Sequence, residues 1–281
     1  MRQKLGQHFL KNTSVINTII DALHLERGDV VIEIGPGKGA LTIPLGERCR
    51  EMGCSVVAIE KDALLVQKLE SSEVGKLKNI KIIHGDALQE LPRVIARSEL
   101  ATRQSYQHDE IASPGNTGLA MTAHIKLVGN IPYYITGALL RVVSELENLP
   151  TRTVLMVQKE VAKRVSAQPP KMNLLAAATQ IWADVSIIAR LKPHDFDPPP
   201  EVSSAVILLT TPSLRGASLC DEAIFGDCHA RLLARNDEGK AYYNFIHAAF
   251  KQPRKTLLNN LLSKKQELMK TLNQPEKNIL L

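Results

Sequence analysis

The sequence lacks the patterns of a metal-binding or disulfide-bonded protein. Its cysteines form no CxxC pair, and no histidine cluster completes a tetrahedral metal site. The four cysteines are Cys49, Cys54, Cys220 and Cys228. We therefore expect no bound metal and predict free thiols, as in a reducing compartment.

Long apolar segments are also missing. No window of about 18 residues is uninterruptedly apolar, so we expect no membrane span. The N-terminus is basic, but polar residues such as Asn12 and Ser14 interrupt the apolar core that a signal peptide needs. With 44% hydrophobic and 23% charged residues, the composition is that of a globular protein, and we expect a cytoplasmic monomer.

What the sequence does have is an uneven excess of positive charge. The net charge is +6, and residues 231–281 hold ten Lys or Arg against four Asp or Glu. Residues 1–11 add three basic residues and no acid. Basic ends suit a polyanionic partner, because contacts with phosphate release counterions. Charge alone leaves nucleic-acid binding and a plain solubilising surface equally open.

Short apolar segments alternate with helical patterns over most of the chain. Because such Val- and Ile-rich strands are typical of sheets covered by crossover helices on both faces, we predict an α/β domain over residues 1–212 with a mostly parallel seven-stranded sheet. The expected strands are residues 29–35, 55–60, 79–85, 125–130, 151–158, 184–191 and 203–212. The expected helices are residues 40–52, 62–72, 136–147, 159–167 and 173–182.

Two regions depart from this alternation. Residues 94–124 show weak periodicity and a turn cluster, and they are long for a loop in a compact domain. We interpret them as an insertion that is partly helical or mobile. Residues 213–281 change in character and carry helical patterns at 240–250 and 253–270, which predicts a small helical C-terminal domain.

A glycine-rich turn follows the first strand, in the stretch "EIGPGKG". Gly35 and Gly37 allow a tight turn and a close approach of the backbone to a ligand. Glu60 ends the next strand, where a carboxylate can accept both hydroxyls of a ribose. Glu33 precedes the turn and suits a ligand with a positive end, such as the amino group of S-adenosylmethionine. We favour that cofactor over NAD, which needs a pyrophosphate site; a plain tight turn with a surface Glu is the simpler alternative.

Asp86 follows the third strand, at the same carboxyl edge of the sheet. A carboxylate there could accept the adenine amine of the cofactor. The same residue type is also a common helix N-cap. Together with Gly35 and Glu60, Asp86 is predicted to complete one pocket.

The stretch "GNIPYY" ends the fourth strand with an amide, a proline and two tyrosines. An exocyclic amine of adenine is a poor nucleophile, because its lone pair is delocalised into the ring. The side-chain oxygen of Asn130 and the carbonyl of Ile131 could localise that lone pair, and Pro132 would stiffen the turn. Tyr133 or Tyr134 offers a face for an extruded base. The alternative is a strand end with core tyrosines.

Six stretches together resemble the ribosomal RNA adenine dimethyltransferases. They are "LGQHFL" (5–10), "EIGPGKGALT" (33–42), "GNIPYYIT" (129–136), "QKEVAKRV" (158–165), "FDPPPEVSSAVILL" (196–209) and "FKQPRKTLLNNL" (250–261). The similarity is greatest to the small-subunit enzymes that dimethylate two adjacent adenines near the 3′ end of that RNA. It implies a Rossmann-like methyltransferase domain followed by a small helical domain. It also implies an S-adenosylmethionine-dependent N6-dimethyltransferase with a role in small-subunit maturation, whose partner is 16S ribosomal RNA or the pre-30S particle.

The resemblance also implies roles for particular residues. Asn130 and Tyr133 would be catalytic, with Asn130 meeting the target amine and Tyr133 stacking on the base. The implied cofactor-binding residues are His8, Leu10, Glu33, Gly35, Gly37, Glu60, Asp86 and Asn130. The family often has Asn at the position of His8, and the end of this sequence stops before the last helices of the usual C-terminal domain.

Basic residues and one phenylalanine are expected to contact RNA. Lys159, Lys163 and Arg164 recur at helical spacing and could contact phosphate, or could form a solvated face. Phe196 lies in a stiff proline-rich segment that could line the target-base pocket, or could be a linker into the last strand. The basic stretch "KQPRK" adds Arg254 and Lys255.

Three alternatives remain open at this point. One is a large-subunit ribosomal RNA adenine methylase that confers antibiotic resistance. A second is a ribosome assembly or transcription factor that keeps the fold without the chemistry, and a NAD dehydrogenase is the third.

Overall fold

The computed structural model describes residues 8–109 and 124–212. These residues fall into two compact units, one of residues 8–109, 124–163 and 183–212 and one of residues 164–182. The predicted C-terminal domain, Arg254 and Lys255 lie outside the described residues, as does the later part of the predicted insertion.

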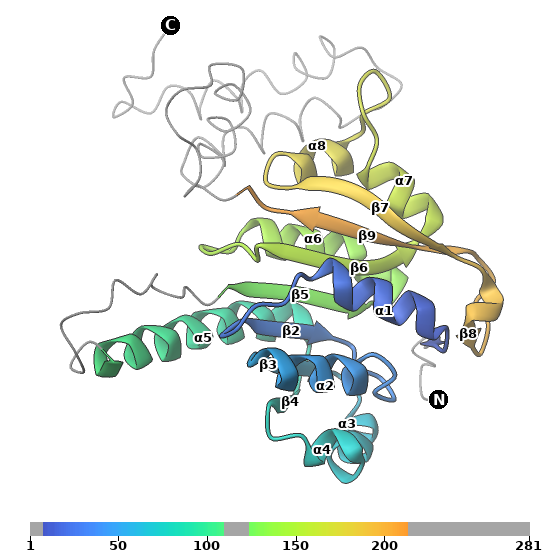
Figure 1. Ribbon diagram of the computed structural model, residues 1–281. Coiled ribbons are helices and arrows are strands. Elements are labelled where there is room, and N and C mark those ends of the chain that lie inside the picture. The colour runs from blue at the N-terminus through green and yellow to red at the C-terminus, as the bar shows by residue number, and fades with distance from the viewer. Residues whose placement is uncertain (1–7, 110–123, 213–281) are drawn as a thin grey trace, which may run out of the picture. The chain divides into compact units, whose positions relative to one another are not determined.

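A seven-stranded sheet forms the centre of the first unit (Figure 1). Its strand order is β4-β3-β2-β5-β6-β9-β7. The first five strands run parallel, and β9 pairs antiparallel with both β6 and β7. The bounds are β2 Val30–Ile34, β3 Ser55–Glu60, β4 Ile80–His84, β5 Ile125–Asn130, β6 Arg152–Gln158, β7 Asp184–Leu191 and β9 Ser204–Thr210. The prediction of a mostly parallel seven-stranded sheet is confirmed.

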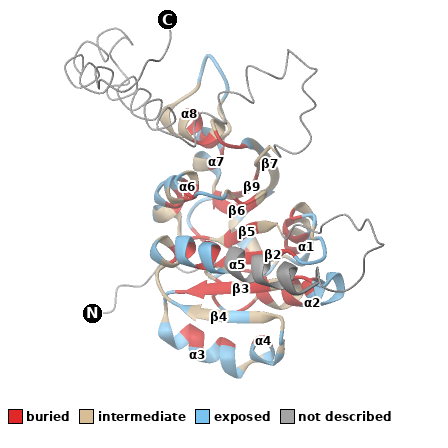
Figure 2. Ribbon diagram, turned by 90° about the vertical axis from the view of Figure 1, so that its left-hand side faces the viewer, coloured by how far each residue is buried: buried red, intermediate tan, exposed pale blue. Residues whose placement is uncertain are grey.

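Helices cover both faces of this sheet. The α-helices are α1 Thr13–Ala22, α2 Thr42–Met52, α3 Ala63–Ser71, α4 Glu73–Lys76, α5 Ala87–Asp109, α6 Thr136–Ser144, α7 Lys159–Val165 and, in the second unit, α8 Leu174–Gln180. Figure 2 shows α1 and α2 on one side of the sheet and α6 on the other. Apolar side chains of α1 and α2 pack on one sheet face to form a continuous core. The central strands are buried on both faces, whereas β4 at the edge is only partly buried.

Several elements differ from the predictions or are additional to them. Residues 94–109 belong to α5, one helix that begins at Ala87 and includes Pro92. Helix α1 was not predicted as a separate element. A two-residue strand β1, Phe9–Leu10, pairs antiparallel with β8, Phe196–Asp197, and forms a small second sheet. Within the described part of the chain, no helix is long and apolar enough to cross a membrane.

Candidate active site

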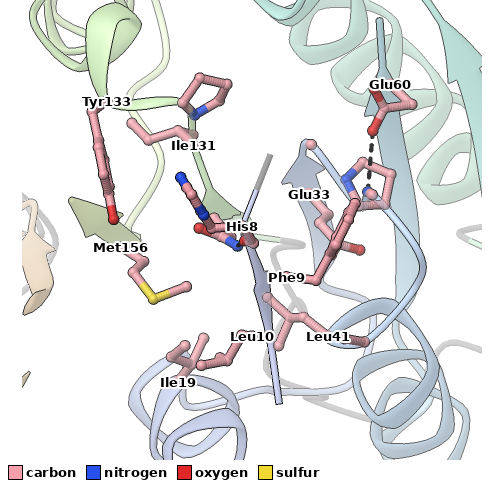
Figure 3. A pocket seen from close by; sticks show the side chains of 16 residues that line it. His8, Phe9, Leu10, Ile19, Glu33, Leu41, Glu60, Ile131, Tyr133 and Met156 are labelled. Carbon is pink, nitrogen blue, oxygen red and sulfur yellow. Dashed lines mark hydrogen bonds between the residues drawn. The ribbon is translucent and has the colours of Figure 1, made fainter. Parts of the chain in front are cut away.

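A pocket lies at the carboxyl ends of β2, β3 and β5, where the strands of a parallel sheet deliver ligand-binding residues. It is walled by the glycine turn after β2, the segment after β5 and the N-terminal residues around β1 (Figure 3). The predicted site residues that line it are His8, Leu10, Glu33, Gly35, Gly37, Glu60, Asn130 and Tyr133. The structure therefore brings together residues that are up to 125 positions apart in the sequence.

Glu60 stabilises the glycine turn through a hydrogen bond. Gly35 and Gly37 adopt φ of 68° and 60°, a region that favours glycine. One carboxylate oxygen of Glu60 accepts a hydrogen bond from the backbone N–H of Gly37 at 3.1 Å, and the other accepts from Asp62 N–H at 2.9 Å. Each oxygen has a second lone pair, so Glu60 can still accept hydroxyl groups of a ribose.

Glu33 is a buried carboxyl group without a full set of partners. Its side chain is 1% exposed, and its Oε2 has no hydrogen-bond partner among the described residues. Burial raises the pKa of Glu33 to about 8, and the nearby charge of Glu60 adds to the rise. A cationic ligand group would restore the ionised form, so this end of the pocket fits the positive end of S-adenosylmethionine.

A segment that we call the strap, residues 8–12, covers the glycine turn. The pairing of β1 with β8 holds it, and Asp195 accepts hydrogen bonds from Lys11 N–H at 2.9 Å and from the Asn12 side-chain amide at 2.8 Å. The ring of Phe9 lies so close to Gly37 that a Cβ there would be 2.8 Å from it. Lys38 Nζ lies 4.4 Å from the centre of the Phe9 ring, a cation–π contact.

Asn130 and Tyr133 line the part of the pocket formed by the end of β5 and the segment after it. Asn130 Nδ2 donates a hydrogen bond to the backbone carbonyl of His8 at 2.8 Å. Because a carbonyl can only accept, this bond sets the orientation of the amide and leaves Oδ1 as an acceptor. The Tyr133 hydroxyl is 2.7 Å from the Ser204 Oγ. Tyr133 is partly buried and Tyr134 is 70% exposed, so neither is a core tyrosine.

Asp86 does not line this pocket in the structure. Its carboxylate forms an ion pair with Lys61 Nζ at 2.7 Å, and its other oxygen accepts from Leu88 N–H at the start of α5. The hydrogen bond from Lys61 lowers the pKa of Asp86. Asp86 therefore caps a helix and pairs with a lysine, and its contact with a cofactor stays a prediction.

The described residues predicted to contact RNA lie in two different environments. Lys159, Lys163 and Arg164 are exposed on α7, where Lys163 pairs with Glu160 at 2.7 Å. Phe196 is 1% exposed and pairs in register with Leu10. Phe196 is packed in the core, where it positions the strap, and it does not line the pocket. Its contact with RNA or the target base stays a prediction.

Sequence reasoning missed several residues that line the pocket, and two of them are close to the predicted site residues or to the target-base end. The first is Phe9, whose ring covers the glycine turn; it lies in the conspicuous stretch "GQHFL", which gave the only signal. The second is Met156 on β6, which lines the pocket but reads as one more apolar strand residue. Among the described residues, no group of three or more His, Cys, Asp or Glu side chains is placed to hold a metal ion.

The fold and the pocket together indicate the class of protein. A mostly parallel sheet with a glycine turn, an acid at the end of the next strand and an amide–proline–tyrosine segment after β5 is the arrangement of a Rossmann-like methyltransferase. Residues 1–215 match the family "Ribosomal RNA adenine dimethylase". The chain belongs to this family.

Individual relatives agree with that assignment. The chain is 34% identical to "Ribosomal RNA small subunit methyltransferase A" of Dehalococcoides mccartyi, with 97% of this chain and 80% of the relative covered. It is 31% identical to the protein of the same name from Koribacter versatilis, over 96% of this chain and 86% of the relative.

Solved structures share the fold. A dimethyladenosine transferase from Plasmodium falciparum matches with a TM-score of 0.65 and 21% identity, over 97% of this chain and 85% of that one. The 23S rRNA methyltransferase ErmE matches with a TM-score of 0.60 and 21% identity, over 91% and 84% of the two chains.

Proposed function

We propose that the protein is an S-adenosylmethionine-dependent enzyme that dimethylates N6 of two adjacent adenosines near the 3′ end of small-subunit (16S) ribosomal RNA. Its partner is this RNA, free or within the pre-30S particle, and it acts as a cytoplasmic monomer in ribosome small-subunit maturation. The observation that carries the proposal is the Asn130 amide, which is held at the pocket with its oxygen left to accept. Similarity to small-subunit methyltransferases over nearly the whole chain supports the choice of RNA.

The pocket residues divide the cofactor between them. Glu33 would face the amino group, the glycine turn the methionine end and Glu60 the ribose, while Leu10 and the rest of the strap would exclude water. We keep Asp86 as the proposed partner of the adenine amine, which requires its carboxylate to be shared with Lys61 or released from it.

Catalysis would consist mainly of positioning. The cofactor supplies a methyl group that its sulfonium already makes electrophilic, so no general base is needed before transfer. Asn130 Oδ1 and the Ile131 carbonyl would accept hydrogen bonds from the target amine, localise its lone pair and aim it in line. Tyr133 would stack on the base. Lys159, Lys163 and Arg164, with Arg254 and Lys255, are proposed to bind RNA phosphates.

Mass spectrometry of small-subunit RNA from cells lacking the protein tests the proposal. We expect the two adjacent dimethyladenosines to be missing, to return with the wild-type gene and to stay missing with Asn130→Ala. Dimethyladenosine that persists in the deletion strain would refute the proposal. Labelled methyl groups that enter large-subunit RNA instead would establish the resistance-methylase alternative, and a variant that complements without methylation would establish a non-catalytic assembly factor.

A further inference from the structure

Two cysteines lie at the two ends of the turn that joins α2 to β3. Helix α2 ends at Met52, and Gly53 follows with φ of 74°, the left-handed conformation that ends many helices. The backbone N–H of Cys54 then donates to the carbonyl of Cys49 at 2.8 Å. This pattern is the Schellman motif, in which the side chains at these two positions frequently pack together. The turn therefore brings the two sulfur atoms into the same place.

The two side chains are free thiols that interact directly. A hydrogen bond between them has the largest influence on the pKa of each thiol. It lowers the pKa of Cys54, and together with burial it raises the pKa of Cys49. Cys49 is therefore the donor, and Cys54 is the thiol that ionises more readily. Because the thiolate is the reactive form of cysteine, Cys54 is the nucleophile of the pair.

The pair lies in apolar surroundings beside a buried ion pair. Cys49 and Cys54 belong to the core that α2 forms with the sheet. Lys126 and Asp29 are both buried, and their charged groups are 2.5 Å apart. The charges of Lys126 and Asp29 shift the pKa of each thiol in opposite directions. The difference between the two thiols therefore comes mainly from the hydrogen bond that joins them.

A single short turn covers the pair from solvent. Cys49 is 0% exposed and Cys54 is 6% exposed. The residues between them that follow Arg50, which are Glu51, Met52 and Gly53, are all exposed. A small neutral oxidant therefore needs only a local opening of this turn to reach Cys54.

We propose that Cys49 and Cys54 are a modification site, at which hydrogen peroxide oxidises the two thiols to an intramolecular disulfide. The Cys54 thiolate attacks one peroxide oxygen and breaks the O–O bond, which gives a sulfenic acid on Cys54 and, once the leaving hydroxide takes up a proton, water. The Cys49 sulfur then attacks the Cys54 sulfur, and the sulfenic hydroxyl leaves as water with the Cys49 proton. Two thiols lose two electrons, and one peroxide is reduced to two waters.

The disulfide would join α2 to β3 at the end of these elements that lies away from the pocket. At the pocket end, Glu60 on β3 already holds Gly37, shortly before α2 begins. Oxidation would therefore tie the two elements together at both ends. Because a cross-link restricts the unfolded chain, the oxidised protein should be the more stable form.

Tryptic peptides give a direct test, because trypsin cleaves after Lys and Arg and separates the two cysteines into the peptides 49–50 and 51–61. The full-length Cys220→Ser/Cys228→Ser protein retains only the pair as thiols. It is treated with a few equivalents of hydrogen peroxide, the peroxide is removed with catalase, and free thiols are alkylated in denaturant before digestion.

We expect mass spectrometry to find the two peptides joined, to find them separate after reduction, and to find neither cysteine alkylated. If both cysteines are alkylated after peroxide treatment, or if the joined peptides come from two different chains in a covalent dimer, the proposal is wrong. This test changes neither cysteine of the pair, so it decides even where a variant of the pair fails to fold.

Single variants on the same background test the two roles. In Cys49→Ala the sulfenic acid on Cys54 has no thiol to react with, so dimedone should trap it. In Cys54→Ala the remaining thiol is fully buried, and it should react with peroxide at least about tenfold more slowly. If Cys49 in Cys54→Ala reacts as fast as Cys54 in Cys49→Ala, Cys54 is not the nucleophile.

Urea unfolding measures the effect of the disulfide on the fold. The peroxide-treated protein with both cysteines should unfold at a higher urea concentration than the reduced protein, and a reductant should reverse the shift. Cys49→Ala treated in the same way should show no such increase. A lower urea midpoint in the oxidised protein would show that the native turn does not accommodate the disulfide, and would overturn the proposed site.

Discussion

Asn130 and His8, 122 positions apart in the sequence, are joined by a 2.8 Å hydrogen bond from the side-chain amide of one to the backbone carbonyl of the other. The bond connects the end of β5 to the strap. The two ends of the Asn130 amide are therefore available for different tasks. Its nitrogen holds the strap, and its oxygen is left as a hydrogen-bond acceptor. Under the proposed function, cofactor retention and alignment of the target amine would be coupled through this one side chain.

Two substitutions of Asn130 separate these tasks. Asn130→Asp keeps an acceptor but cannot donate to His8, so we expect weaker cofactor binding and a smaller loss of turnover. Asn130→Ala removes both groups and should lower kcat by about 10²–10³-fold, as loss of a preorganised polar group does. Calorimetric cofactor titration and labelled methyl transfer measure the two effects. Equal kcat in Asn130→Ala and wild type would exclude a catalytic role.

The seven strands and their positions along the chain were predictable, because each strand is a short apolar run with a turn signal at its end. The same local signals placed Gly35, Glu60 and Asn130 at one edge. The strap could not be predicted in this way. Strand β1 has two residues and no periodicity, and it exists because β8 lies beside it. The burial of Phe196 against the strap could not be predicted either, since a tertiary contact leaves no trace in local pattern.

The buried carboxyl of Glu33 should make stability depend on pH. Its folded-state pKa, about 8, lies above the ordinary value of 4.5. Between these values the unfolded chain releases the proton and the folded protein keeps it, so stability falls as pH rises, by up to about 1.4 kcal/mol per pH unit. Glu33→Gln should remove this contribution. Urea unfolding without cofactor at pH 5, 6, 7 and 8 measures the free energy of unfolding of both proteins. If the difference in free energy between wild type and Glu33→Gln were constant with pH, the prediction would be wrong.

Cofactor binding should release a proton from the same carboxyl. At pH 7 the free protein holds Glu33 mostly protonated, because burial raises its pKa to about 8. A bound ammonium group lowers that pKa, so up to about one proton is released and affinity rises with pH toward 8. Titration calorimetry in buffers of different ionisation enthalpy counts the protons. Glu33→Gln should release fewer, and comparing the two proteins cancels any proton exchange by the ligand itself.

Asp86 has two possible roles: it could bind the adenine amine of the cofactor, or it could serve only to pair with Lys61. Asp86→Ala should weaken cofactor binding about tenfold if the carboxylate accepts the adenine amine, the loss of one charge-assisted hydrogen bond. Lys61→Met breaks the same ion pair but keeps the carboxylate, so its cofactor affinity should equal or exceed that of the wild type. Calorimetry on both variants decides. An unchanged affinity in Asp86→Ala would leave Asp86 with only its roles as helix cap and ion-pair partner.

The contact between Phe9 and Gly37 can be tested with a matched pair of glycines. Gly37 and Gly28 both have positive φ, 60° and 85°, so alanine strains the backbone at either position by about 1 kcal/mol. A Cβ at Gly37 would lie 2.8 Å from the Phe9 ring, whereas at Gly28 it would meet nothing within 4 Å. Both variants should lose stability in urea unfolding, and Gly37→Ala at least as much as Gly28→Ala.

Only Gly37→Ala should displace the strap. Because the strap covers the pocket, we expect the cofactor affinity of this variant to fall about tenfold or more, which corresponds to a loss of about 1.4 kcal/mol of binding free energy. Gly28→Ala should bind like the wild type. Adding Phe9→Leu to Gly37→Ala removes the clashing ring atoms and should recover part of the affinity. If Gly28→Ala weakens binding as much as Gly37→Ala, backbone strain rather than the strap controls the pocket.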